Sequence, residues 1–148
     1  MKQKLFSEED KKLIVESIRI AEKNCSGEIR VHIDDECEID PLDRAVEIFE
    51  ILGMHKTKLR NGVLFYMSEK DKKFAVIGDV GINSKVGYEF WHEIRDIVLD
   101  GFRNKEFGQG LANGIKKVGQ ALAAYFPYDS KTDVNELSDE ISFYSKKE

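Results

Sequence analysis

Residues 61–78 read NGVLFYMSEKDKKFAVIG, and this stretch decides the fold. It holds two nearly continuous apolar runs, residues 63–67 and residues 74–77, separated by a polar, lysine-rich segment. Apolar runs of this length with turn residues between them are typical of two buried strands joined as an antiparallel hairpin. The sequence therefore predicts the centre of a sheet whose strands are buried.

Another strand and a helix come before this hairpin. Apolar and polar side chains alternate over residues 29–34, which is the period of a strand with one apolar and one polar face. Asp40 and Pro41 supply an N-cap and a first-turn proline for the helix, and Gly53 ends it. The apolar stripe of this helix consists of Leu42, Ala45, Val46, Phe49 and Leu52. A strand, a helix and a strand in this order predict that the first two strands are parallel.

Helices account for most of the remaining sequence. Residues 7–10 read SEED, the pattern of a capping box, and we expect a helix over about residues 8–24. Apolar residues recur at helical spacing through residues 90–102 and again through residues 111–125, where Pro127 ends the pattern. The order α-β-α-β-β-α-α predicts an α/β fold, an α/β/α sandwich around a small mixed sheet.

One domain is expected to span residues 1–148, with its core over about residues 8–125. Residues 126–148 form a polar C-terminal tail, of which one part should pack back on the core as a turn of helix. The apolar residues of this tail are Leu137, Ile141, Phe143 and Tyr144.

Composition limits the function classes. The chain has 148 residues, a net charge of -5 and 34% charged residues, which argues against a broad electrostatic surface for nucleic acid or for an anionic membrane. Cations or basic partners suit this charge better. No run of about 18 apolar residues is present, and no apolar segment follows the lysines at the N-terminus, so we expect a cytoplasmic protein without direct membrane insertion.

Residues 24–36, NCSGEIRVHIDDE, resemble two covalent phosphatase sites without matching either. A thiolate loop needs arginine six residues after the cysteine, and six residues after Cys25 is Val31. An aspartyl phosphatase needs Asp-x-Asp, whereas Asp34 is followed two positions later by Glu36. Cys25 is therefore interpreted as a small apolar residue at a helix-strand junction, and a disulfide to Cys37 is not expected because an extended strand separates the two.

Polar residues gather at both ends of the predicted sheet. At one end, residues 78–83 read GDVGIN, a glycine-flanked turn whose carbonyls, together with Asp79, Asn83 and Glu28, form a candidate site for a hard divalent cation. The alternative is that Asp79 and Asn83 only hydrogen-bond their own turn, and that Glu28 pairs with a nearby arginine. Both interpretations remain open at this stage.

The other end of the sheet carries the acidic run DDECEID, residues 34–40. Asp34, Asp35 and Glu36 form the second candidate cation site. Such a run is also typical of a solvated loop that leads into the N-terminus of a helix, where negative charge is favoured. His32, on the polar face of the first strand and without an identifiable partner, is expected to be hydrogen-bonded in place.

The combination of EIRVHI, RNGVLFYM, KFAVIGDVGIN and FRNKEFGQGLANGI resembles the TPM domain family, also called the TPM phosphatase family. The resemblance covers about residues 8–125 and rests on the order and spacing of the segments. It implies a sheet sandwiched by helices. Many members read G-Y-G-L-E where this sequence reads GDVGIN, so Asn83 stands where glutamate is common and Asp79 is added. Many members also carry a signal peptide and a C-terminal membrane helix, and we expect neither here.

For function, the resemblance implies binding of a divalent cation, Ca²⁺ or Mg²⁺, and the phosphatase activity attributed to some members. Two classes follow. In the first, the cation orders a loop of an accessory or interaction module that contacts a protein partner, for instance in a membrane-associated complex. In the second, the cation polarises a phosphomonoester and activates water, as in a metal-dependent acid phosphatase. The first class is favoured, since only Arg60 and Lys85 offer a phosphate clamp near the proposed site.

Overall fold

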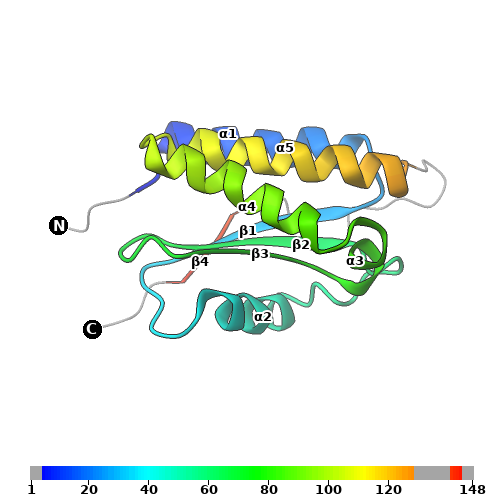
Figure 1. Ribbon diagram of the computed structural model, residues 1–148, viewed down its shortest axis with the longest axis horizontal. Coiled ribbons are helices and arrows are strands. Elements are labelled where there is room, and N and C mark those ends of the chain that lie inside the picture. The colour runs from blue at the N-terminus through cyan, green and yellow to red at the C-terminus, as the bar shows by residue number, and fades with distance from the viewer. Residues whose placement is uncertain (1–4, 129–140, 145–148) are drawn as a thin grey trace.

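The computed structural model describes residues 5–128 and 141–144, which form helices on both faces of a four-stranded sheet (Figure 1). The elements in chain order are α1 (Glu8–Lys23), β1 (Glu28–Asp34), α2 (Pro41–Ile51), β2 (Gly62–Ser68), β3 (Phe74–Gly78), α3 (Val80–Val86), α4 (Tyr88–Arg103), α5 (Phe107–Tyr125) and β4 (Ser142–Tyr144). The predicted α/β sandwich with a mixed sheet is confirmed.

The strands lie side by side in the order β3-β2-β1-β4. β1 pairs in parallel with β2, in a register that sets Glu28 opposite Gly62, and β3 returns antiparallel to β2 with Gly78 opposite Val63. Both strand directions agree with the sequence prediction. Because β3 runs antiparallel to β2, the start of β2 and the end of β3 meet at one end of the sheet.

Two apolar layers hold the sheet between the helices. Among the described elements, α1, α4 and α5 cover one face and α2 covers the other, as Figure 1 shows. Alternate residues of each strand belong to alternate layers, since successive side chains of a strand point to opposite faces. Ile29 and Val63 pack under the three helices, whereas Leu64 and Tyr66 pack against α2.

The glycines of FGQGLANGI serve helix packing. A Cβ on Gly110 would lie 2.9 Å from the carbonyl oxygen of Val98 and 3.1 Å from the Cα of Gly101, so α5 and α4 touch almost backbone to backbone. Only glycine on both helices permits this approach. The segment is therefore a packing surface between α4 and α5.

Two local predictions were wrong. Residues 78–83 are not a free turn, because the Asp79 side chain caps a helix, α3, that begins at Val80. The tail does not return as a helical turn over its described part: Ser142–Tyr144 is a strand, β4, that pairs in parallel with the free edge of β1. Leu137 lies outside the described residues.

The ends of α1 and α2 follow the sequence signals. Ser7 and Asp10 form the expected capping box at the start of α1. Asp40 accepts a hydrogen bond from the Leu42 N–H at 2.8 Å, and Pro41 opens α2. Among the helices in the described ranges, none combines the length and apolar character that crossing a membrane requires.

Candidate functional site

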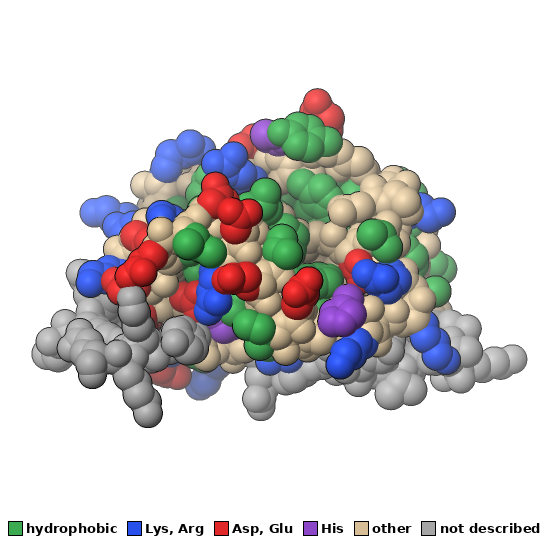
Figure 2. All heavy atoms as spheres, turned by 90° about the horizontal axis from the view of Figure 1, so that it is seen from below, with side chains coloured by type: hydrophobic (Ala, Val, Ile, Leu, Met, Phe, Trp, Pro, Cys, Tyr) green, Lys and Arg blue, Asp and Glu red, His purple; other side chains and the backbone are tan. Residues whose placement is uncertain are grey.

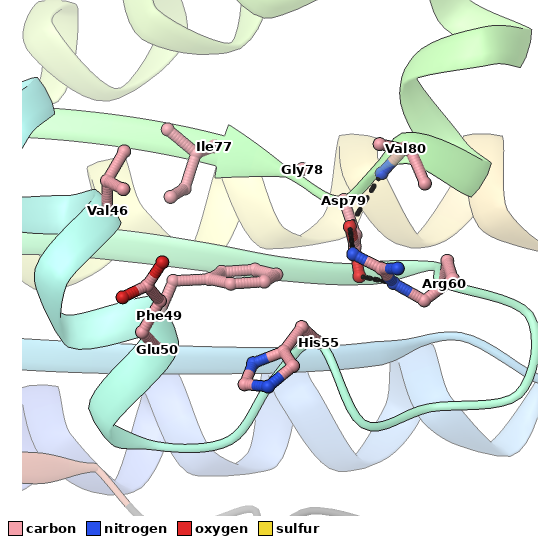
Figure 3. Close-up of a pocket in the computed structure, with 9 residues that line it drawn as sticks. All are labelled: Val46, Phe49, Glu50, His55, Arg60, Ile77, Gly78, Asp79 and Val80. Carbon is pink, nitrogen blue, oxygen red and sulfur yellow. Dashed lines mark hydrogen bonds and ion pairs between the residues drawn. The ribbon is translucent and has the colours of Figure 1, made fainter.

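A cleft of about 520 Å³ opens between α2 and the end of β3. Its lining, drawn in Figure 3, combines apolar and charged side chains: Val46, Phe49, Glu50, His55, Arg60, Ile77, Gly78, Asp79 and Val80. The face of the molecule that carries α2 shows exposed apolar side chains among charged ones (Figure 2). A cavity that joins an apolar wall to a few polar groups is the usual form of a ligand site.

The sheet topology brings Arg60 and Asp79 together at this cleft. The Asp79 N–H donates to the Gly62 carbonyl at 2.9 Å, and the Gly81 N–H donates to the Arg60 carbonyl at 2.8 Å. These two bonds join the end of β3 and the first turn of α3 to the start of β2. Arg60 itself has a left-handed backbone with φ 52°, a conformation that costs a non-glycine residue about 1 kcal/mol.

The two side chains form a two-pronged ion pair. Arg60 Nε donates to Asp79 Oδ2 at 2.6 Å, and Arg60 Nη2 donates to Oδ1 at 2.8 Å. The Asp79 side chain is only 4% exposed, whereas that of Arg60 is 45% exposed. The hydrogen bonds to Asp79 raise the pKa of the Arg60 guanidinium. The carboxylate is thus buried and neutralised by one edge of the Arg60 guanidinium.

Asp79 also caps α3, and Asn83 within this helix bonds back to the end of β3. The Val80 N–H donates to Asp79 Oδ1 at 2.8 Å, and Asn83 Nδ2 donates to the Gly78 carbonyl at 2.8 Å. The indole N–H of Trp91 donates to Asn83 Oδ1 at 2.7 Å. Local hydrogen bonding, which the sequence left open as the alternative to a cation site, therefore occurs at both residues.

Of the three residues predicted as cation ligands at this end, only Asp79 lines the cleft. Glu28 is buried on β1, opposite Gly62, and the oxygen of Asn83 accepts from an indole. Within residues 5–128 and 141–144, no group of three His, Cys, Asp or Glu side chains is arranged to hold a metal ion. In this arrangement both carboxylate oxygens of Asp79 accept hydrogen bonds from Arg60, and cation binding at Asp79 stays a prediction.

Sequence reasoning missed Glu50 and His55 as lining residues. Glu50 sits on α2, and His55 follows it in the loop to β2; in Figure 3 the ring of Phe49 points from α2 toward the Arg60–Asp79 pair. Neither belongs to a recognisable motif. Their place at the cleft depends on how α2 packs across β3, and the one available signal was the basic run HKTKLR at residues 55–60.

The second candidate site is a buried polar network. Asp34 accepts hydrogen bonds from Arg44 Nε at 2.9 Å and from the Tyr66 hydroxyl at 2.6 Å, and it lies 2.8 Å from His32 Nε2. The other ring nitrogen of His32 lies 2.7 Å from the Ser142 hydroxyl, so the expectation that this histidine is hydrogen-bonded in place is confirmed. The network links β1, β2, α2 and β4.

Burial and hydrogen bonding act in opposite directions on Asp34. Burial alone would raise the pKa of its carboxyl group, but the hydrogen bonds from His32, Arg44 and Tyr66 outweigh burial and lower the pKa from 3.8 to about 2. Burial and the bond to Asp34 raise the pKa of Tyr66. Asp34 is thus an ionised carboxylate whose oxygens are taken up by hydrogen bonds within the fold.

Asp35 and Glu36 contact the hairpin between β2 and β3. The Asp35 carbonyl accepts from the Lys70 N–H at 2.8 Å, and the Glu36 carboxylate lies 3.3 Å from Lys70 Nζ. These contacts fasten the acidic loop to the hairpin between β2 and β3. The assignment of Asp34, Asp35 and Glu36 as a cation site stays a prediction.

The cleft, the order of strands and the helix layers can be compared with known proteins. The family model described as TPM domain matches residues 1–121 of this chain. The chain belongs to the TPM domain family. No curated protein matches it.

Two solved structures agree with this TPM assignment. The NMR structure of the BA42 protein from the psychrophilic bacterium Bizionia argentinensis is 47% identical, covers 94% of this chain and 95% of its own, and has a TM-score of 0.86. The N-terminal domain of a protein from P. gingivalis is 18% identical, covers 84% of this chain and 83% of its own, and has a TM-score of 0.68. The second likeness shows that the TPM fold is retained at low sequence identity.

Proposed function

We propose that this TPM domain is a binding module that takes its ligand in the cleft between α2 and β3. The observation that carries the proposal is the Arg60–Asp79 pair, which places an exposed guanidinium and a buried carboxylate beside the apolar wall of Val46 and Ile77. Apolar surface supplies binding energy and a few fixed polar groups supply orientation. The expected ligand is a protein partner, and a partner in a membrane-associated complex is one candidate.

A divalent cation would compete with Arg60 for the carboxylate of Asp79. Calcium or magnesium requires carboxylate oxygens, and both oxygens of Asp79 already accept hydrogen bonds from Arg60. Because the Arg60 side chain is 45% exposed, it can leave Asp79 without disturbing the core. Binding at the cost of this ion pair should be weak, with a dissociation constant of roughly 10⁻⁴ to 10⁻³ M, as in other sites with few carboxylates.

Melting temperatures with and without calcium test this competition. At about 10 mM calcium, a dissociation constant near 1 mM stabilises the fold by about 1.4 kcal/mol, or roughly 4 °C. Asp79→Asn should remove this gain, and Arg60→Gln should enlarge it because the carboxylate no longer has a competing cation. Asp35→Asn is the control and should keep the wild-type gain. Sodium chloride at matched ionic strength excludes general screening.

The possible outcomes show at which end of the sheet the cation binds. A gain that survives in Asp79→Asn but vanishes in Asp35→Asn would move the cation to the acidic loop at residues 34–40. A gain that is unchanged in Arg60→Gln would contradict the competition. If calcium does not raise the melting temperature of the wild-type protein, the cation site is contradicted, and the cleft stays a proposed site for a protein partner only.

The phosphatase alternative rests on the exposed guanidinium of Arg60, which has the donors that a phosphoryl group needs. His55 lies at the same cleft and supplies an imidazole for proton transfer. Hydrolysis of p-nitrophenyl phosphate, measured with calcium, with magnesium and with a chelator, tests this class. Activity that depends on a cation and disappears in Arg60→Gln would support it, whereas inactivity under all three conditions would contradict it.

A further inference from the structure

The outer edge of β3 presents backbone groups next to the cleft, and at its end the Gly78 carbonyl already accepts from Asn83 Nδ2. Hydrogen bonds from Ser68 N–H to the Lys73 carbonyl and from Asp79 N–H to the Gly62 carbonyl bracket the β2–β3 ladder. Ladder bonds of an antiparallel pair fall on alternate residues, so residues 75 and 77 face β2 and the amides of Phe74, Val76 and Gly78 face outward. In the part of the chain that the structure describes, no strand pairs with this edge.

Apolar side chains flank this edge on the side of α2. Leu42 and Val46 were expected in the buried stripe of α2, yet they are 51% and 49% exposed, and Val80, the first residue of α3, is 62% exposed. Ile77 joins Val46 in the lining of the cleft. Figure 1 shows α2 below β3 and α4 above it, so a strand added to β3 would place alternate side chains against α2.

The end of this groove is basic. The loop of residues 55–60 reads HKTKLR, and His55, Lys56, Lys58 and Arg60 are all exposed. Among the described residues, neither Lys56 nor Lys58 forms an ion pair with a carboxylate, whereas the charge of Arg60 is met by Asp79. A local positive loop on a chain of net charge -5 favours an acidic segment at this end of β3.

We propose that an extended segment of a partner protein adds to the outer edge of β3 as an antiparallel strand. Its apolar side chains face Val46 and Ile77, and acidic residues at its N-terminal end lie against the basic loop of residues 55–60. Backbone hydrogen bonds to an exposed strand give affinity, and alternate side chains give specificity. This inference rests on the proposed function, because it names the partner class that the cleft takes.

A synthetic peptide of three glutamates followed by about seven alternating valines and threonines is the probe. Titrated into ¹⁵N-labelled protein, it should shift the amide signals of Phe74, Val76 and Gly78 and slow their hydrogen exchange. Val76→Pro removes an outward N–H without touching the ladder to β2, and it should weaken binding at least about tenfold. Val76→Ala is the matched control, since it shortens the same side chain and keeps the amide, and should bind within about threefold of wild type.

Changes of charge at the exposed residues Lys56 and Lys58 test which end of the groove binds the acidic part of the peptide, and they leave the core unchanged. Replacing Lys56 and Lys58 by glutamate should weaken the acidic peptide several-fold at low salt, and a peptide with lysines in place of the glutamates should bind the wild-type protein several-fold more weakly than the acidic one. Equal binding of both peptides would overturn the proposal. So would a dimer of the protein that Val76→Pro dissociates, because a second copy would then be the occupant of this edge.

The calcium experiment distinguishes the cation site at Asp79 from the strand added to β3. Val76→Pro should retain the calcium-dependent gain in melting temperature, because Asp79 is bound to β2 through its own N–H. A calcium response without any peptide binding would overturn the added strand and leave the cation site standing. Peptide binding without a calcium response would support the added strand and contradict the cation.

Discussion

Asp34 should make the stability of the fold depend on pH in the acid range. Burial disfavours its charge, but hydrogen bonds from His32, Arg44 and Tyr66 lower its folded pKa from 3.8 to about 2. Between these two values the unfolded chain binds more protons than the folded one, so stability increases with pH. The contribution of Asp34 is therefore complete above about pH 5 and is lost as the pH falls toward 2.

The magnitude follows from the same two values. A lowering of the pKa from 3.8 to about 2 corresponds to roughly 2.4 kcal/mol of stability when the carboxylate is fully ionised. At pH 2 the folded carboxyl group is half protonated, and about 2 kcal/mol of that stability is lost. For a domain of this size, 2 kcal/mol is a large part of the total.

Urea unfolding between pH 2 and pH 6 measures this contribution as a difference between wild type and Asp34→Asn. The variant should be less stable at pH 6, because Arg44 keeps a partly buried charge without its carboxylate partner. The difference in the free energy of unfolding between the wild type and Asp34→Asn should then decrease by about 2 kcal/mol when the pH is lowered to 2.

Tyr66→Phe is the graded control for this experiment. It removes one of the three hydrogen bonds that lower the pKa of Asp34, so it should show a smaller acid loss than the wild type. A gap between wild type and Asp34→Asn that stays constant from pH 6 to pH 2 would refute the reasoning. The pH titration of the Asp34 carboxyl carbon by NMR gives the same pKa directly.

Three further substitutions test the packing and the chemistry. Gly81→Ala would place a Cβ against the carbonyl oxygens of Leu59 and Arg60, so it should destabilise the fold by about 2 to 4 kcal/mol in urea unfolding and weaken any calcium response. Wild-type stability of this variant would contradict the close approach. Gly110→Ala should cost about 1 to 3 kcal/mol through its contact with Gly101, and a neutral effect would mean that α4 and α5 can separate freely. Cys25→Ser should leave any phosphatase activity intact while a chelator removes it, and the opposite pattern would point to a thiolate mechanism.

The sequence was sufficient to predict β1, β2 and β3 and the helices α1, α2, α4 and α5. Apolar runs around residues 63–67 and 74–77 are long enough to be buried strands, and the capping signals at Ser7 and Asp40 are local hydrogen-bonding patterns. Local signals of this kind need no tertiary information. The strand directions followed from the crossover through α2 and from the short hairpin.

The site depended on contacts that local patterns do not encode. GDVGIN resembles a glycine turn, but the Asp79 side chain accepts from Val80 and starts a helix, and Arg60 reaches the same carboxylate from another segment. Val46 was assigned to the core because its spacing is helical, although the sheet beneath α2 ends at β3 and leaves this side chain half exposed. β4 was missed because a three-residue strand gains its stability from pairing with β1 alone.

The most direct test of a cation site at the cleft is a calcium titration followed by backbone amide shifts. Calcium at Asp79 should move the signals of Gly78, Val80 and Arg60, because the cation displaces Arg60 and alters the first turn of α3. The signals of Asp35 and Glu36, at the other end of the sheet, should stay in place. Shifts confined to Asp35 and Glu36, with Gly78 and Val80 unmoved at saturating calcium, would contradict a cation site at the cleft between α2 and β3.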